Sequence, residues 1–234
     1  MSGRLNTLTP SKNSYDWLGY GVYFYEADSA RAFKYAETSA KNLEQLLTAQ
    51  AIGTPAVVGA VLNVERWLDI TTQFGIAQFT EGLNSMKAGF KAVGKAIPAN
   101  KPAFVGDRDN LHRALDKAVF ENIHAIRSAK CAEAIRNEAR LSADDVAKMV
   151  MGFAEFQGVR GAFQQGGALD AGSAIYEDSH IQLAIRDPEC VLGWFLVPGD
   201  KLLADDAYAD AKVKLAAAKR RKTSLKQRVK ATTS

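Results

Sequence analysis

The stretch of sequence that most constrains the fold is residues 16–36, DWLGYGVYFYEADSARAFKYA. Gly19 and Gly21 stand two positions apart, so the backbone can turn tightly there and another group can approach it closely. The next four residues, Val-Tyr-Phe-Tyr, are β-branched or aromatic and predict a short buried strand. Asp28 or Ser29 can then cap a helix. This succession could hold a flat ring beside backbone amides, although aromatic residues on a strand more often pack a core.

The pattern Gly-Val-Tyr-Phe, followed by Ser-Ala-Arg-Ala-Phe-Lys-Tyr, resembles the second signature of the PARP-like ADP-ribosyltransferases. In that superfamily a Gly-x-Tyr-Phe strand leads into a helix that closes one side of the NAD pocket. Residues 57–71 and 158–198 are similar to the middle and the end of the same fold. The sequences PSKNSYDWLGYGVYF and SHIQLAIRDPECVLGWF resemble those of small bacterial and phage proteins of this type.

The resemblance implies an NAD-dependent ADP-ribosyltransferase, with NAD as co-substrate and a protein or a nucleic acid as acceptor, of the kind used as bacterial or phage toxins and defence effectors. It places the residues that contact NAD at Gly19, Gly21, Tyr23, Ser29, Arg31 and Tyr35. Tyr23 would stack on the nicotinamide. Arg31 could bind the pyrophosphate in a bidentate fashion, or it could be an ordinary surface residue of the helix.

A departure from the family pattern concerns the catalytic glutamate, which in many relatives opens the late strand. In this chain that position falls at or near residues 180–182. Gln182 can accept a hydrogen bond from a hydroxyl but is no base, whereas His180 could act as a base at neutral pH. Glu177 and Glu26 are further carboxylate candidates. Relocated catalysis, mono-ADP-ribosylation with weaker acid–base needs, and a non-catalytic NAD-binding relative all stay open.

A second departure lies at the N-terminus. Relatives place a strand with a His-Gly or Arg pair before the glycine turn, where it binds the nicotinamide amide and ribose. Residues 1–13 are short and polar, predict a loop, and leave no room for that strand. We therefore expect either a truncated chain start or a protein without the conventional NAD clamp.

The composition of the 234 residues predicts one domain over residues 1–200 and a tail over residues 201–234. Two cysteines form no disulfide framework, and the three histidines share no metal-ligand spacing, so no metal is expected. No apolar run reaches membrane-spanning length and no signal-peptide core is present. These features predict a cytoplasmic protein with no membrane contact.

Positive charge is concentrated in the tail. Residues 201–234 hold ten Lys or Arg against three Asp, whereas residues 1–200 hold twenty basic and twenty-three acidic side chains. The tail predicts an alanine-rich and basic helix. Its segment from Lys219 to Lys230 is either a solvated tail or a nucleic-acid contact.

The predicted fold class is α+β, an ADP-ribosyltransferase-like split and mainly antiparallel sheet with surrounding helices. The predicted strands are residues 22–25, 57–64, 159–163, 181–186 and 191–197. The predicted helices are residues 29–50, 74–93, 111–128 and a helix or helical pair over 129–156. A loop is expected over residues 97–109, and His112 and His124 are expected to be solvated or hydrogen-bonded at the edge of their helix.

The pleat of the strands predicts where the site residues point. Tyr23 and Tyr25 share one face of their strand, and His180 and Gln182 share one face of theirs. If the two strands are neighbours, these faces meet across one groove. Two other functions remain: a nucleic-acid-binding module carried by the tail, or an inactive transferase fold that binds a protein partner.

Overall fold

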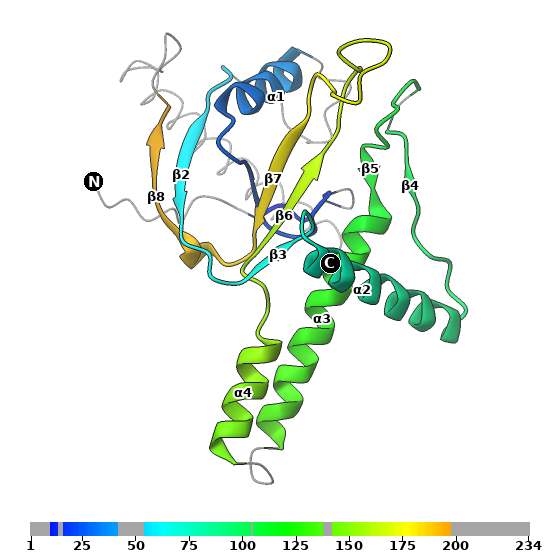
Figure 1. Ribbon diagram of the computed structural model, residues 1–234, viewed down its shortest axis with the longest axis vertical. Helices are drawn as coiled ribbons and strands as arrows, with labels where there is room; N and C mark the ends of the chain where they lie inside the picture. The colour runs from blue at the N-terminus through cyan, green and yellow to red at the C-terminus, as the bar shows by residue number, and fades with distance from the viewer. Residues whose placement is uncertain (1–9, 14–15, 42–53, 104, 138–141, 198–234) are drawn as a thin grey trace, which may run out of the picture.

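The computed structural model describes residues 10–13, 16–41, 54–103, 105–137 and 142–197 (Figure 1). The fold is α+β, as predicted, with helices around sheets that are mostly antiparallel. The strands are β1 (Val22–Tyr25), β2 (Val58–Leu62), β3 (Trp67–Asp69), β4 (Asn100–Lys101), β5 (His112–Arg113), β6 (Gly158–Phe163), β7 (His180–Ile185) and β8 (Val191–Leu196). The helices are α1 (Ser29–Lys41), α2 (Gln73–Ala92), α3 (Ala114–Arg136), α4 (Ala143–Phe153) and a 3-10 turn at Pro188–Cys190. The predicted tail and the end of the helix predicted over residues 29–50 lie outside the described residues.

Four strands form the main sheet in the order β1-β7-β6-β3. β7 pairs antiparallel with both β1 and β6, whereas β3 pairs parallel with β6. β2 and β8 form a separate antiparallel ribbon, and β4 and β5 form a third, smaller one. All five predicted strands are therefore present and the sheet is split. The structure adds β3, which the sequence left as a turn or a short strand, and β4 and β5.

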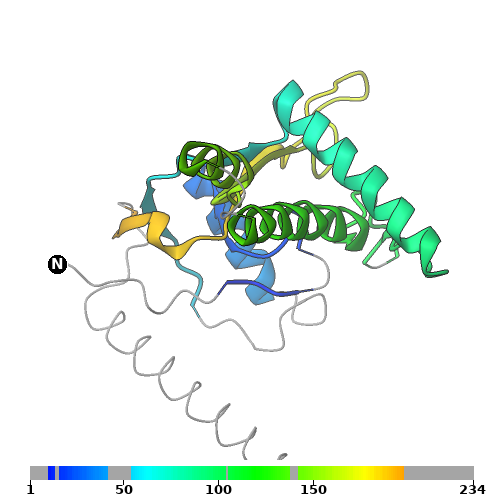
Figure 2. The ribbon, with the colours of Figure 1, turned by 90° about the horizontal axis from the view of Figure 1, so that it is seen from below.

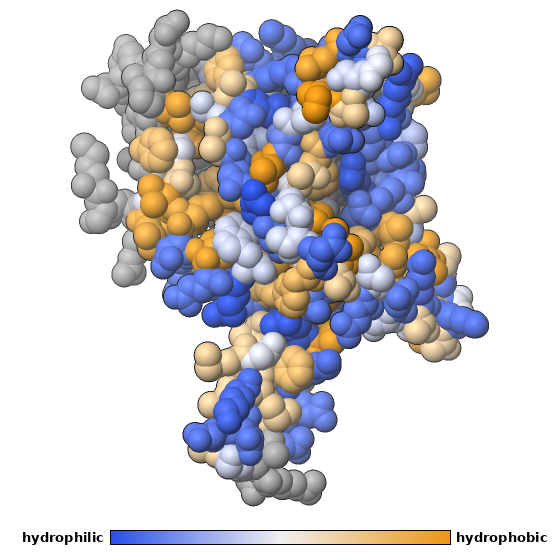
Figure 3. Space-filling view, viewed as in Figure 1, coloured by the Kyte–Doolittle hydropathy of each residue, from blue (hydrophilic) through white to orange (hydrophobic). Residues whose placement is uncertain are grey.

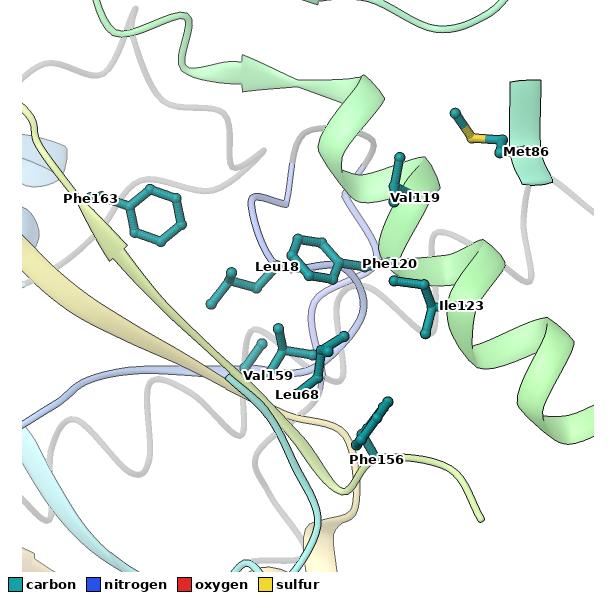
Figure 4. Packing of buried hydrophobic residues seen from close by; sticks show 10 residues of the cluster. Leu18, Leu68, Met86, Val119, Phe120, Ile123, Phe156, Val159 and Phe163 are labelled. Carbon is teal, nitrogen blue, oxygen red and sulfur yellow. The ribbon is translucent and has the colours of Figure 1, made fainter. Parts of the chain in front are cut away.

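The main core lies between one face of the four-stranded sheet and α3 (Figure 4). From the sheet side, Val159, Ala184 and the partly buried Tyr23 pack with Leu18. α3 contributes Val119, Phe120 and Ile123. Phe120 is 1% exposed, so its truncation to alanine would cost about 3–5 kcal/mol.

A second cluster packs on the opposite face of the main sheet. It consists of Leu183, Ile185 and Cys190, with Phe24 of β1 packed against them. The β2–β8 ribbon covers this side through Leu62 and other apolar residues. Successive residues of β1 thus point into different clusters, because side chains alternate along a strand.

The helices α2, α3 and α4 form the other half of the molecule (Figure 2). Thr72 caps α2 by accepting a hydrogen bond from the Gly75 N–H at 3.1 Å. Gly75 packs so closely on the Asp69 carbonyl that a Cβ has no room there. The pair α3–α4 extends away from the sheets (Figure 1). The predicted helix over residues 74–93 is confirmed by α2, and the predicted helical pair by α3 and α4.

Three predictions about this half are wrong in detail. The helix predicted over residues 111–128 begins at Ala114 and continues to Arg136, because β5 occupies the two preceding residues. The predicted loop over residues 97–109 contains β4, which pairs with β5. His124 was expected at the edge of its helix, but it is 2% exposed and lies in the buried stripe of α3 between Ile123 and the Phe156 ring.

Candidate functional site

The glycine turn before β1 is fixed against α3 by an ion pair. Gly19 has a φ of +82°, a left-handed conformation that favours glycine. The Tyr20 N–H donates to Oε1 of Glu121 at 2.5 Å, and Arg186 donates to the Tyr20 carbonyl at 3.1 Å and to Glu121 at 3.3 Å. Burial alone would raise the pKa of Glu121, but these hydrogen bonds hold it below its usual value. The carboxylate therefore stays ionised and locks the start of β1 in place.

Tyr23, the residue expected to stack on nicotinamide, has its hydroxyl engaged inside the protein. The hydroxyl accepts from the Leu18 N–H at 2.8 Å and donates to the Gly19 carbonyl at 2.7 Å. The ring packs against the main core, and burial raises the pKa of the phenol. Tyr23 also borders the cleft described next. Its principal contacts are thus structural, and only part of its surface is offered to a ligand.

A cleft of about 1380 Å³ runs along β1, which is an edge strand of the main sheet. One wall comes from α1 and from the β2–β8 ribbon, including Val58 and Phe195. Residues 106–109 and 165–167 border the other side. Figure 3 shows apolar side chains gathered over β2 and β8. The cleft thus combines an apolar wall with polar loops.

Tyr25 supplies the aromatic group that meets α1 in this cleft. The guanidinium carbon of Arg31 lies 5.2 Å from the centroid of the Tyr25 ring. The ring of Tyr35 lies 6.2 Å from it, tilted by 52°. Burial raises the pKa of Tyr25 to about 12, so its hydroxyl stays neutral. The structure therefore brings two of the predicted residues, Arg31 and Tyr35, to a tyrosine two positions beyond the predicted one.

Arg31 is held in place with 10% of its side chain exposed. Its N–H donates to the Asp28 carboxylate at 2.8 Å, which confirms Asp28 as a cap of α1. One guanidinium N–H donates to Gln165 at 2.8 Å, and Nε lies 3.8 Å from Asp178 without a hydrogen-bond partner. Asp178 also accepts from Lys34 at 2.6 Å. An anionic ligand could therefore exchange with Asp178 for the Arg31 guanidinium.

β7 carries the two residues predicted to face the aromatic strand. Gln182 lies directly opposite Tyr25 in the β1–β7 register and borders the cleft, as predicted for that face. His180 is on the same face, with its ring centroid 5.0 Å from that of Tyr25, but it is 7% exposed. Its Nδ1 lies 2.6 Å from the Asp178 carbonyl, its Nε2 is buried without a partner, and burial lowers its pKa. His180 is thus a neutral ring beneath Tyr25, and Gln182 is the group at the cleft.

The two predicted carboxylates are placed differently. Glu26 borders the cleft, but its Oε2 accepts from Arg160 at 2.7 Å. Arg160 also donates to Asp69 at 2.9 Å, so one guanidinium serves two carboxylates. Glu177 is exposed in the loop before β7, and its N–H donates to the Gly167 carbonyl at 2.9 Å. The cleft is thus bordered by Glu26 but not by the side chain of Glu177.

Of the remaining predicted residues, Ser29 begins α1 and borders the cleft. Gly19 and Gly21 shape the turn and do not border the cleft. A Cβ on Gly21 would lie 3.0 Å from the Ile185 carbonyl, so this glycine is needed for close contact with β7.

Sequence reasoning missed two site residues at the start of the same stretch, Asp16 and Trp17. Asp16 is 7% exposed; its Oδ1 accepts from the Ser11 hydroxyl at 2.8 Å, its Oδ2 has no partner, and burial raises its pKa. The Arg113 guanidinium lies 4.1 Å from the Trp17 ring centroid, and Trp17 Nε1 donates to the Leu111 carbonyl at 3.0 Å. Asp16 and Trp17 both border the cleft. Their partners lie far along the chain, so no local pattern could have identified them.

Comparison with protein families, with curated proteins and with solved structures finds no match for this chain. Within the described ranges, no group of three or more His, Cys, Asp or Glu side chains is placed to hold a metal ion. None of the helices described is both long and apolar enough to cross a membrane.

Proposed function

We propose that this chain binds NAD in the cleft along β1 and transfers its ADP-ribose group to an acceptor. One observation carries the proposal: Tyr25, Arg31 and Gln182 come from three different elements and meet at one cleft. The volume of about 1380 Å³ exceeds the range of about 300–1,000 Å³ usual for ligand sites, so it has room for a dinucleotide. The resemblance of residues 16–36 to the transferase signature supports the same ligand. A cytoplasmic location would give access to NAD.

The reaction breaks the bond between nicotinamide nitrogen and C1′ of the ribose. The bonding electron pair leaves with nicotinamide, which departs neutral, and the ribose passes through a transition state with oxocarbenium character. A nucleophile of the acceptor then bonds to C1′ and loses its proton to a base. The protein must hold the nicotinamide ring, orient the ribose and admit the acceptor.

Each of the three residues has a role that its chemistry allows. The Tyr25 ring offers a stacking surface, with Tyr35 beside it. Arg31 can bind the pyrophosphate through two parallel N–H donors once it releases Asp178. The carboxamide oxygen of Gln182 can accept a hydrogen bond from a ribose hydroxyl, but it cannot remove a proton.

The proposal is tested by calorimetric titration of the full chain with NAD and by measuring nicotinamide release. Loss of a charge-assisted hydrogen bond costs about 1.5–3 kcal/mol, so Arg31→Ala should raise the Kd for NAD by about 10- to 100-fold. Arg136→Ala, at the end of α3, removes the same charge outside the cleft and should leave the Kd unchanged. A wild-type chain that binds no NAD would remove the proposal.

A second candidate is a non-catalytic binder, and the state of the carboxylates favours it. Glu26 is paired with Arg160, and Asp178 with Lys34. Asp28 caps α1, and Asp107 accepts from several backbone N–H groups. Tight binding of NAD without nicotinamide release would establish the binder and exclude the transferase.

A further inference from the structure

The outer edge of β1 is open in the part of the chain that the structure describes, beyond its first contact. Glu26 donates to the Ile181 carbonyl of β7, so Phe24 and Val22, two and four residues earlier, also direct their backbone groups toward β7. Tyr23 and Tyr25 therefore direct their N–H and C=O groups away from β7, toward the cleft. The same alternation is seen one step earlier, where Gly21 exchanges two backbone hydrogen bonds with Ser11 at 2.7 and 3.4 Å.

This edge can accept another extended chain. Tyr23 and Tyr25 offer two N–H donors and two carbonyl acceptors, spaced as in any antiparallel ladder. Both residues border the cleft, so a strand that adds there lies within it. Peptide binding by strand addition uses such an edge, with side chains of the added strand alternating between two faces.

The charge of the cleft selects the kind of chain that can enter. Its acidic lining residues are Asp16, Glu26, Asp28, Asp107, Asp109 and Asp178. Its basic lining residues are Arg31, Lys34 and Arg108. Six carboxylates against three cations give a net charge of −3 at neutral pH, counted over the same lining. Arg160 does not offset this excess, because it is shared between Glu26 and Asp69.

A nucleic acid is disfavoured at such a surface. Nucleic-acid binding depends on Lys and Arg that neutralise phosphates, and an acidic cleft repels them. A polypeptide with Lys or Arg is attracted by the same charge and can also satisfy the backbone groups of β1.

We propose that the cleft along β1 binds an extended polypeptide segment that carries Lys or Arg, and that this segment pairs with the open edge at Tyr23 and Tyr25. That the segment is also the acceptor of ADP-ribose rests on the proposed function. The two ligands use different surfaces: NAD uses the Tyr25 ring and Gln182 on the sheet face, whereas the segment uses the backbone edge.

The test uses the full chain and three fluorescent probes of ten units at low salt: a peptide of alternating Lys and Val, the same peptide with Glu for Lys, and a single-stranded thymidine oligonucleotide. The Lys peptide should bind at least tenfold more tightly than either of the others. A copy of it methylated on every backbone nitrogen keeps its charge but has no N–H donors, and should bind at least tenfold more weakly. Equal binding of the two Lys peptides would overturn the strand pairing, and preference for the oligonucleotide or the Glu peptide would overturn the proposal.

Two charge variants complete the test. Glu26→Gln with Asp109→Asn reduces the cleft charge by two, and should weaken Lys-peptide binding and flatten its salt dependence. Glu81→Gln with Asp144→Asn makes the same change at exposed positions outside the cleft, and should leave binding unchanged. Equal effects of the two pairs would show attraction by overall charge alone and overturn the docking site. Peptide binding without NAD binding would remove the transferase and keep this surface, whereas NAD binding without peptide binding would do the reverse.

Discussion

His124 should make the stability of this protein fall as the pH is lowered from neutrality. The side chain lies in α3 with 2% exposure, and neither ring nitrogen has a hydrogen-bond partner. Burial lowers its pKa from 6.5 to about 3. The nearest carboxylate, Glu155, lies 3.7 Å from Nδ1 and is half exposed. Below pH 6.5 the unfolded chain therefore binds a proton that the folded chain refuses.

The size of the effect follows from the two pKa values. Because the folded pKa is depressed, the stability is fully present above the unfolded pKa and is lost as the pH falls toward the folded one. Between pH 7 and pH 5 the unfolded state gains about 2 kcal/mol from protonation of this one residue, while the folded state gains almost nothing. By pH 3 the loss approaches about 5 kcal/mol, a large part of the stability of an ordinary domain.

The assay is urea unfolding at pH 7 and pH 5 for three proteins. The wild type should lose about 2 kcal/mol more than His124→Leu over this interval, because leucine has similar volume and does not titrate. Ile123→Val is the matched control in the same buried stripe; it should cost about 0.5–1.5 kcal/mol at both pH values and keep the wild-type pH slope. Equal slopes for the wild type and His124→Leu would refute a buried neutral histidine at this position.

Three further predictions follow from single contacts. Tyr23→Phe removes the hydroxyl bonded to Leu18 and Gly19 and should lower the free energy of unfolding by about 1–3 kcal/mol while the Kd for NAD stays the same; a changed Kd with unchanged stability would return the ligand-binding role to Tyr23. Gly75→Ala drives a Cβ into the Asp69 carbonyl and should destabilise by about 1–3 kcal/mol or more, whereas Gly89→Ala, with open space around it on the same helix, should be neutral or stabilising in the same urea assay. Deleting residues 212–234 should weaken any nucleic-acid binding and flatten its salt dependence with little change in melting temperature; an unchanged affinity would exclude the tail as the contact.

Local patterns in the sequence were enough to predict the elements that surround the cleft. The glycine pair, the Val-Tyr-Phe-Tyr run and Asp28 each act within a few residues, and β1 and α1 form where they indicate. The alternation of side chains likewise placed Tyr25 and Gln182 on one face, because a pleat leaves no other arrangement once the strands pair.

The wrong or missing predictions depend on partners far along the chain. The hydrophobic stripe of α3 was recognised, but the sequence could not show that Phe156 would close over His124. The choice between Tyr23 and Tyr25 as the ring in the cleft depends on Arg31 and on the turn that holds the Tyr23 hydroxyl. Long-range packing of this kind is outside what propensity and periodicity encode.

Gln182 limits the chemistry of the proposed transferase in a specific way. A carboxylate at its position could both orient a ribose hydroxyl and take the proton of an acceptor, whereas a carboxamide can only orient. His180 is withdrawn beneath Tyr25 with its proton-accepting nitrogen buried, so it does not supply the missing base from the same face. Under the proposed function, departure of nicotinamide would be assisted by positioning alone, and the acceptor would lose its proton to solvent or to a group on the acceptor itself. A Lys- or Arg-bearing segment held along β1 is then selected by charge and backbone pairing rather than by acid–base chemistry. Gln182→Glu separates these roles: nicotinamide release that rises in this variant at unchanged NAD affinity would show that proton removal limits the wild type, and unchanged release would show that positioning does.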